Sequence, residues 1–375
     1  MRLALAEIRR AKLRFSLLTG AVALLVFLIL FQQTLASALL GSFTGGLEHQ
    51  SATVLAYSED ARRSIDASRV LPRTVAEVGA VEGVAEAGPI GEATFTVEAG
   101  GEQRDTTVFG YSLGGPGQPT TLVEGRLPAA DGEAVASSID ASKGYGIGQT
   151  VTVLPGDTRV SIVGLAKDAQ FNVQPTLYVS FGTYEAITRA ANPAAEAVLP
   201  NVVGVEPVSG VDPETLASRI TGEVEGIEAL DRSTAVSSQP GVDSITQSFA
   251  IILLLAFVVV VLVTGFFFLI LTVQKTQALT LLRAVGASTS YLVGALALQV
   301  VLVTLAGIAI ASVLLAFATS GSGTGLEVSV SPRLILLTGS GVLILALLAS
   351  LGAMRRVVRI EPAAAAARVA GGGLA

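Results

Sequence analysis

FSLLTGAVALLVFLILFQQTLASALL, which covers residues 15–40, is a run of 26 residues without a Lys, Arg, Asp or Glu. A helix needs about 20 mostly apolar residues to cross the hydrocarbon core of a bilayer. Three further uncharged runs lie between Ser244 and Met354, and the 202 residues of the 42–243 segment separate them from the first. The sequence therefore predicts a membrane protein with four spanning helices and one large domain inserted between the first and the second.

The composition agrees with this class. Hydrophobic residues make up 51% of the chain and charged residues only 14%, well below the roughly 25% of an average soluble domain. Cysteine is absent, which excludes disulfides and thiolate-based metal or redox chemistry.

The charges are distributed unevenly along the chain, and this predicts the topology. The 1–14, 274–290 and 355–375 segments together hold 11 basic residues and two acidic ones, whereas the 42–243 segment holds 12 basic and 27 acidic residues. Basic residues are enriched in cytoplasmic segments. We therefore expect both termini in the cytoplasm and the 42–243 domain outside it.

The predicted segments alternate between helices in the membrane and connections in water. The expected segments, in chain order, are a cytoplasmic amphipathic segment at 1–14, helices at 15–41, 244–273, 291–318 and 333–354, an extracytoplasmic domain at 42–243, a cytoplasmic connection at 274–290, an outer loop at 319–332 and a cytoplasmic tail at 355–375.

The first run has a second interpretation. A basic start, an apolar stretch and Ala36-Ser37-Ala38 are also features of a secretory signal peptide with its cleavage site. An uncleaved helix is favoured because the apolar stretch is longer than the about 7–15 residues of a signal peptide.

Short β-branched runs bounded by turn residues predict that the outside domain is α+β. Five such runs lie at 94–97, 151–154, 160–163, 177–180 and 202–205, and Pro155-Gly156-Asp157 suggests a hairpin. Asp212 followed by Pro213 predicts a capped helix start. The 72–84 and 213–227 segments share a helix–glycine–strand pattern, which indicates two α+β subdomains.

The 274–290 segment, here called the coupling segment, predicts a short amphipathic helix. Ala278, Leu281, Leu282 and Val285 recur at the spacing of one helix face, and Gly286 then ends the helix. An apolar stripe of this kind lies on lipid or packs against a partner protein.

Leu281-Leu282-Arg283-Ala284-Val285-Gly286-Ala287-Ser288, between two membrane helices, resembles the signature of the FtsX-like permeases, the class that includes macrolide- and lipoprotein-exporting ABC systems. The basic 3–14 segment and Arg359-Ile360-Glu361-Pro362-Ala363 resemble the opening and closing motifs of this family. Glu124-Gly125-Arg126, followed by Gly144 and Gly148, resembles a motif of its MacB-like periplasmic core domain. The resemblance covers almost the whole chain.

The resemblance implies a permease without an ATPase site of its own. Every Walker A loop needs a Gly-Lys pair, and none of the four lysines follows a glycine. A separate ABC ATPase would dock on the coupling segment, through Leu279, Leu282, Arg283, Ala284 and Gly286. The resemblance also implies a homodimer in a bacterial plasma membrane, in which closure of the ATPases on ATP would move the outside domains. Arg283 is alternatively a topology charge that contacts only lipid headgroups.

Three short strings, at 6–8, 273–277 and 296–299, resemble the heme-exporter branch of the family. In that branch heme is the transported substrate, and the chain needs no resident cofactor or metal. Glu48 and His49, the only histidine, are the candidate substrate ligands, since imidazole commonly ligates heme iron. The alternative is an exposed juxtamembrane connection.

Other functions stay open at this point. An FtsX-like permease can transmit a signal to an extracellular enzyme without moving a solute, and an exporter of this class can carry a drug, a peptide or a lipid. A membrane receptor unrelated to ABC systems is opposed by the motif at 281–288. The acidic outside domain opposes nucleic-acid binding, and a single histidine at the membrane boundary opposes a Ser/His/Asp hydrolase.

Overall fold

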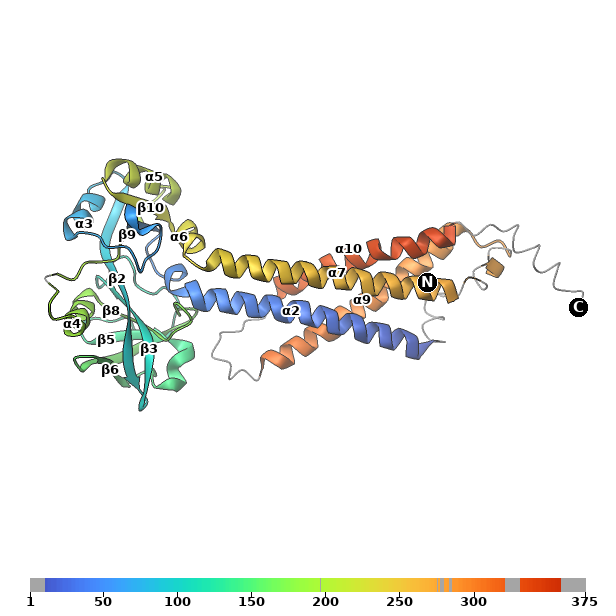
Figure 1. Cartoon of the computed structure of the whole chain (residues 1–375), viewed down its shortest axis with the longest axis horizontal. Helices are drawn as coiled ribbons and strands as arrows, with labels where there is room; N and C mark the ends of the chain where they lie inside the picture. Colours follow the sequence, from blue (N-terminus) through green and yellow to red (C-terminus); the bar gives the residue numbers. More distant parts are fainter. Residues whose placement is uncertain are drawn as a thin grey trace, which may run out of the picture. The chain divides into compact units, whose positions relative to one another are not determined.

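The computed structural model describes residues 11–195, 197–274, 276, 280–282, 285–320 and 331–358, with the backbone alone for 353–358. Most of the predicted 1–14 segment, the 319–332 loop and the 355–375 tail, with the motif that begins at Arg359, lies outside the described residues. The chain forms two compact units (Figure 1). The inserted domain spans Ser37–Gln247, and the helical unit contains the chain up to Ala36 and most of it from Ser248 onward.

Four long apolar helices run through the helical unit. They are α2 (Lys12–Glu48), α7 (Val242–Gln274), α9 (Thr289–Thr319) and α10 (Pro332–Val358). Each contains a stretch long and apolar enough to span a membrane. One helix precedes the inserted domain and three follow it, which confirms the predicted fold class.

The side chains of α2 divide into a buried stripe and an exposed one. Phe15, Leu18, Val22, Val26 and Ile29 are buried in the core of the helical unit. Their spacing of three or four residues places them on one face of the helix. Leucines on the opposite face are exposed, as expected for side chains that face lipid.

Contacts with all three other helices hold α2 inside the helical unit. Arg14 Nη1 donates a hydrogen bond of 2.7 Å to Gln274 Oε1 on α7. Thr338 Oγ1 on α10 donates one of 2.6 Å to the Gln33 side chain. On α9, a Cβ at Gly307 would lie 2.8 Å from Val22 Cγ1, so the absence of a side chain there allows close helix packing.

The helix α2 continues beyond the predicted end at residue 41. Thr44 Oγ1 donates to Leu40 O at 2.9 Å, and the His49 amide donates to Gly45 O at 2.9 Å. The added turns are part of the inserted domain, where Gly46 N donates to Gln170 O at 2.8 Å. The apolar run therefore predicts only the part of the helix that can lie in the bilayer.

Ten strands of the described residues form one sheet. The strands are β1 (Val54–Ser58), β2 (Val84–Ala99), β3 (Glu102–Tyr111), β4 (Leu122–Gly125), β5 (Glu133–Ser137), β6 (Thr150–Leu154), β7 (Thr158–Ala166), β8 (Thr176–Ser180), β9 (Val202–Pro207) and β10 (Ile227–Asp231). The helices are α3 (Pro72–Gly79), α4 (Phe181–Ala191), α5 (Pro213–Glu223) and α6 (Arg232–Ser238).

One part of the inserted domain is an antiparallel layer in the order β10-β1-β9-β2. Because α3 joins β1 to β2 and α5 joins β9 to β10, this is the split βαβ arrangement of ferredoxin-like folds. Both helices share one apolar core with the sheet, through Val78 of α3 and Leu216 of α5. Each helix leads into its strand through a glycine with positive φ, Gly83 or Gly226, in the two segments that share a sequence pattern.

The other part is a closed barrel. The pairs β2–β3, β3–β8, β8–β5, β5–β7, β7–β6 and β6–β2 form a ring of six strands, and β4 extends the sheet beyond β7. Closure of the ring removes free strand edges. Because β2 is 16 residues long, its two ends belong to the layer and to the barrel, and the two parts share one sheet.

The predicted local elements of this domain are confirmed. All five predicted runs lie in strands, and β6 and β7 form the antiparallel hairpin expected around Pro155-Gly156-Asp157. Asp212 is the N-cap of α5, with its side chain accepting the Thr215 amide at 3.0 Å.

Tyr184 of α4 occupies a slot that two paired glycines create. Gly91 of β2 lies directly opposite Gly110 of β3, and a Cβ at either position would collide with Tyr184. The buried phenol lies 3.4 Å from Asn201 Oδ1. This contact packs α4 against β2 and β3, of which β2 continues from the layer into the barrel.

We predict that Gly110→Ala destabilises the inserted domain by about 1–3 kcal/mol, because the added methyl overpacks the Tyr184 slot. Gly222→Ala is the control, because a Cβ there meets no atom within 4 Å and alanine favours helix. Calorimetric unfolding of the full chain measures both. Equal transition temperatures for the two variants would contradict the packing assignment.

Candidate functional site

The described residues of the coupling segment lie between the end of α7 at Gln274 and the start of α9 at Thr289. Residues 276 and 280–282 are helical, and Ser288 caps α9 by accepting the Tyr291 amide at 3.3 Å. Of the predicted docking residues, Leu279, Arg283 and Ala284 lie outside the described residues.

Gly286 ends this turn as the sequence predicts. Its φ of +102° is left-handed, a conformation that glycine adopts without steric cost. Val285 N donates to Leu281 O at 3.1 Å, and Ala287 N donates to Leu282 O at 2.9 Å. The second bond is the one that defines a Schellman motif, so Gly286 fixes the geometry of the turn.

The apolar side chains of the coupling segment do not all face the same way, since one packs against α9 and others are exposed. Leu282 is half-buried and packs with Ala287 against Leu292 and Leu296 of α9. Leu281 is 59% exposed and Val285 is 89% exposed. Leu282 thus supports the turn, and Leu281 and Val285 are the residues available to a partner. The helical spacing placed all of them on one stripe and did not separate these roles.

Glu48 and His49 lie where α2 ends. Glu48 is the last helical residue and is exposed, whereas His49 is half-buried. The His49 carbonyl accepts the Thr120 amide at 2.9 Å and the Thr120 hydroxyl at 2.8 Å. His49 Nδ1 is buried and has no hydrogen-bond partner among the described residues. The backbone of His49 therefore holds the domain together, and its imidazole nitrogen is unpaired.

The Glu124-Gly125-Arg126 motif supports the barrel wall. Arg126 forms a two-pronged ion pair with Glu133, with one contact at 2.7 Å, and this pairing lowers the pKa of Glu133 to about 2. Gly125 has a φ of +76°, and a Cβ there would collide with Val163 O. Gly144 has a φ of +100° and lies against Gly100. These glycines allow close backbone approach.

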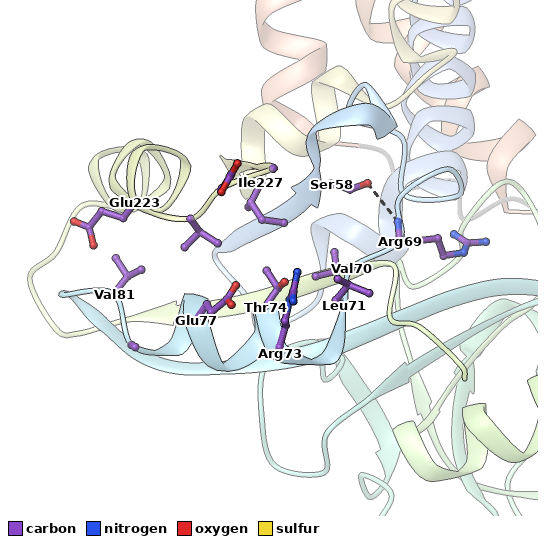
Figure 2. A pocket seen from close by; sticks show the side chains of 14 residues that line it. Ser58, Arg69, Val70, Leu71, Arg73, Thr74, Glu77, Val81, Glu223 and Ile227 are labelled. Carbon is purple, nitrogen blue, oxygen red and sulfur yellow. Dashed lines mark hydrogen bonds between the residues drawn. The ribbon is translucent and has the colours of Figure 1, made fainter. Parts of the chain in front are cut away.

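A groove of about 810 Å³ lies between α3 and the turn from α5 to β10, a volume in the range of about 300–1,000 Å³ for ligand pockets. Figure 2 shows Arg73, Thr74 and Glu77 along α3, with Glu223 and Ile227 on the facing wall. Among the described residues, none of these charged side chains forms an ion pair. No sequence pattern predicts this groove, although the repeated pattern at 72–84 and 213–227 contains the two helices beside it.

A buried acid interacts electrostatically with Arg69, one of the residues that line the groove. Glu92 of β2 is 3% exposed, and its amide donates to Asn201 Oδ1 at 2.8 Å. Burial raises the pKa of the Glu92 carboxyl well above its usual range, a hydrogen bond and the charge of Asp66 raise it further, and Arg69 opposes the shift. Glu92 therefore stays protonated above the pH at which an exposed glutamate ionises.

Four helices long and apolar enough to span a membrane lie in a one-plus-three order, with a layered and barrel-containing domain between the first two, and this indicates an integral membrane protein. Its distinctive segments are the coupling turn that Gly286 ends, the last turns of α2 within the inserted domain, and the groove beside α3.

Comparisons with known proteins give the same class. Residues 250–362 match the family model described as FtsX-like permease C-terminal. The chain is 26% identical over 294 residues to the uncharacterized ABC transporter permease Rv0072 of Mycobacterium tuberculosis, covering 78% of this chain and 77% of that protein. It is 20% identical over 363 residues to the putative hemin transport system permease protein HrtB of Staphylococcus haemolyticus, covering 96% and 98%.

The periplasmic region of MacB from Actinobacillus actinomycetemcomitans is similar at a TM-score of 0.37 and 11% identity, covering 49% of this chain and 90% of that one. The family-model match and these relatives support an ABC transporter permease of the FtsX/MacB type.

We predict that Glu92→Gln stabilises the inserted domain at neutral pH. Because the folded pKa is raised, the folded state holds a proton that the unfolded state releases near the ordinary glutamate pKa of about 4.3. The stability of the unchanged chain therefore falls as pH rises above that value. The glutamine keeps a donor for Asp66 and has no charge. Calorimetry between about pH 4 and pH 8, a range that begins near the ordinary glutamate pKa of about 4.3, should show a shallower pH dependence in the variant. A slope equal to that of the unchanged chain would contradict it.

Proposed function

We propose that this chain is the permease subunit of an ABC exporter, in which a separate ATPase drives motion of the inserted domain. The observation that carries the proposal is the coupling turn, where Leu281 and Val285 are exposed on a geometry fixed by Gly286 and by Leu282. The basic flanks favour a cytoplasmic position for this turn, where the ATPase would dock.

The continuous helix α2 supports a mechanical role. Its backbone is hydrogen-bonded without interruption over 37 residues, so it resists bending more than a loop would. It contacts α7, α9 and α10 in the helical unit. Its last turns are part of the inserted domain. Displacement of the inner helix ends by two ATPases on a homodimer would therefore reach the exterior domain through α2.

The proposal predicts a specific loss of coupling. Leu281→Asp with Val285→Asp should lower permease-stimulated ATP hydrolysis at least about tenfold, because charge on a central apolar contact typically costs 2 kcal/mol or more. Val208→Asp is the matched control, since Val208 is an exposed valine of the inserted domain. ATP hydrolysis by the reconstituted permease–ATPase complex is the measurement.

Membrane insertion and dimer content of each variant are measured beside the ATPase rate. Normal insertion with unchanged stimulation in the double variant would contradict docking at this turn. Equal losses in the double variant and in Val208→Asp would show a general effect on folding.

We further propose that the exported molecule is amphipathic, with heme as the favoured example. The support is the likeness to a putative hemin transport permease and the unpaired Nδ1 of His49. Neutral imidazole nitrogen is a common axial ligand of heme iron. The alternatives are a drug, a peptide or a lipid as cargo, or a signal passed to an extracellular enzyme without transport.

The heme proposal predicts saturable hemin binding by the purified permease. His49→Ala should weaken it about tenfold, because an axial ligand is lost, and Glu48→Gln should weaken it less. Glu77→Gln is a control for a distant exposed acid. A Soret titration measures the affinity. No saturable shift, or equal affinities for His49→Ala and Glu77→Gln, would move the substrate to another class.

A further inference from the structure

We propose that a cleft between α2 and α7, beside Arg14, binds an anionic phospholipid of the cytoplasmic leaflet. The phosphate would lie on the Arg14 guanidinium, and the upper part of one acyl chain would lie in the cleft. The assignment to the cytoplasmic leaflet depends on the membrane orientation proposed above.

The cleft has the shape that this ligand requires. Its volume is about 230 Å³, and it is lined by Arg14, Leu17, Phe267, Ile270, Leu271 and Gln274. Leu271 is buried at its base, whereas Leu17 is 64% exposed and Ile270 is 54% exposed. An apolar floor with exposed apolar walls is suited to a hydrocarbon chain.

The charge at the mouth of the cleft is positive and uncompensated. Arg14 Nη1 donates to Gln274 Oε1 at 2.7 Å, and Arg14 forms no ion pair in the part of the chain that the structure describes. Because the partner is a neutral amide, it orients the guanidinium and leaves its full charge. The remaining N–H groups of an arginine match the oxygens of a phosphate.

The apolar residues that follow Arg14 along α2 favour a phospholipid over a soluble anion as the ligand. Leu17 follows Arg14 by three residues, about 4.5 Å further along the helix axis, and on the same face. A phosphate on Arg14 would therefore have its attached chain beside Leu17 and Ile270. A free phosphate would use only the arginine. A basic residue near the membrane favours anionic over zwitterionic lipid by about fivefold.

The absence of tryptophan from the chain allows a direct test. Leu17→Trp places a single fluorophore at the cleft of the full-length protein in vesicles. We expect brominated phosphatidylglycerol to quench it with about fivefold higher apparent affinity than brominated phosphatidylcholine. Leu28→Trp, on the exposed face of the same helix, is the control and should show no headgroup preference.

A second pair of variants isolates the arginine. Adding Arg14→Gln to Leu17→Trp should remove the preference, whereas Lys12→Gln, an equal loss of charge outside the cleft lining, should keep it. Ile270→Trp repeats the measurement from the other wall in case the first tryptophan fills the cleft.

Four outcomes would overturn the proposal. The first is an equal effect of Arg14→Gln and Lys12→Gln on the preference for phosphatidylglycerol, and the second is the absence of this preference at both tryptophans of the cleft. The third is loss of the preference in millimolar inorganic phosphate, and the fourth is that no lipid quenches these tryptophans because protein covers them. The test contains no ATPase, so a failure of coupling at Leu281 and Val285 would leave its result unchanged.

Discussion

The need of a helix in hydrocarbon to satisfy its own backbone hydrogen bonds is the constraint on which the rest of this structure depends. It requires an unbroken helix for the apolar part of α2, and the helix then continues without a break to a total of 37 residues. The last turns reach beyond any apolar requirement, and Gly45 and Gly46 lie against Asp168 and Phe171 of the inserted domain. A side chain at either glycine would collide with that loop, so the position where α2 ends is fixed by close backbone contact.

The inserted domain has an architecture suited to move as a body. Its antiparallel layer and its barrel share β2, and Tyr184 packs against the glycine pair of β2 and β3. The free edge at β10 is protected, because the Ala229 amide donates to Thr221 Oγ1 of α5 at 2.9 Å. A force applied at α2 would therefore act on a continuous sheet, and the groove beside α3 would travel with it.

Local sequence patterns predicted where the coupling turn ends and did not predict which of its side chains face the protein. The sequence predicts that the coupling turn ends at Gly286, because glycine is the residue that adopts a positive φ, here +102°, without steric cost. The stripe from Ala278 to Val285 could not show that Leu282 packs on α9 while Leu281 is exposed, because the position of α9 is a property of the fold. For the same reason the sequence identifies His49 as the only histidine but does not predict that its carbonyl accepts hydrogen bonds from Thr120.

The sequence by itself determined the four apolar helices, their one-plus-three order, the charge asymmetry and the capped start of α5 at Asp212. Each of these depends on residues that are neighbours along the chain or on the fixed thickness of a bilayer. Only the tertiary structure decided the closure of the barrel by β6, the slot that Tyr184 fills, the burial of Glu92 and the cleft beside Arg14. These features join residues that are tens to hundreds of positions apart, and no local pattern records which of the many possible pairings lowers the free energy most.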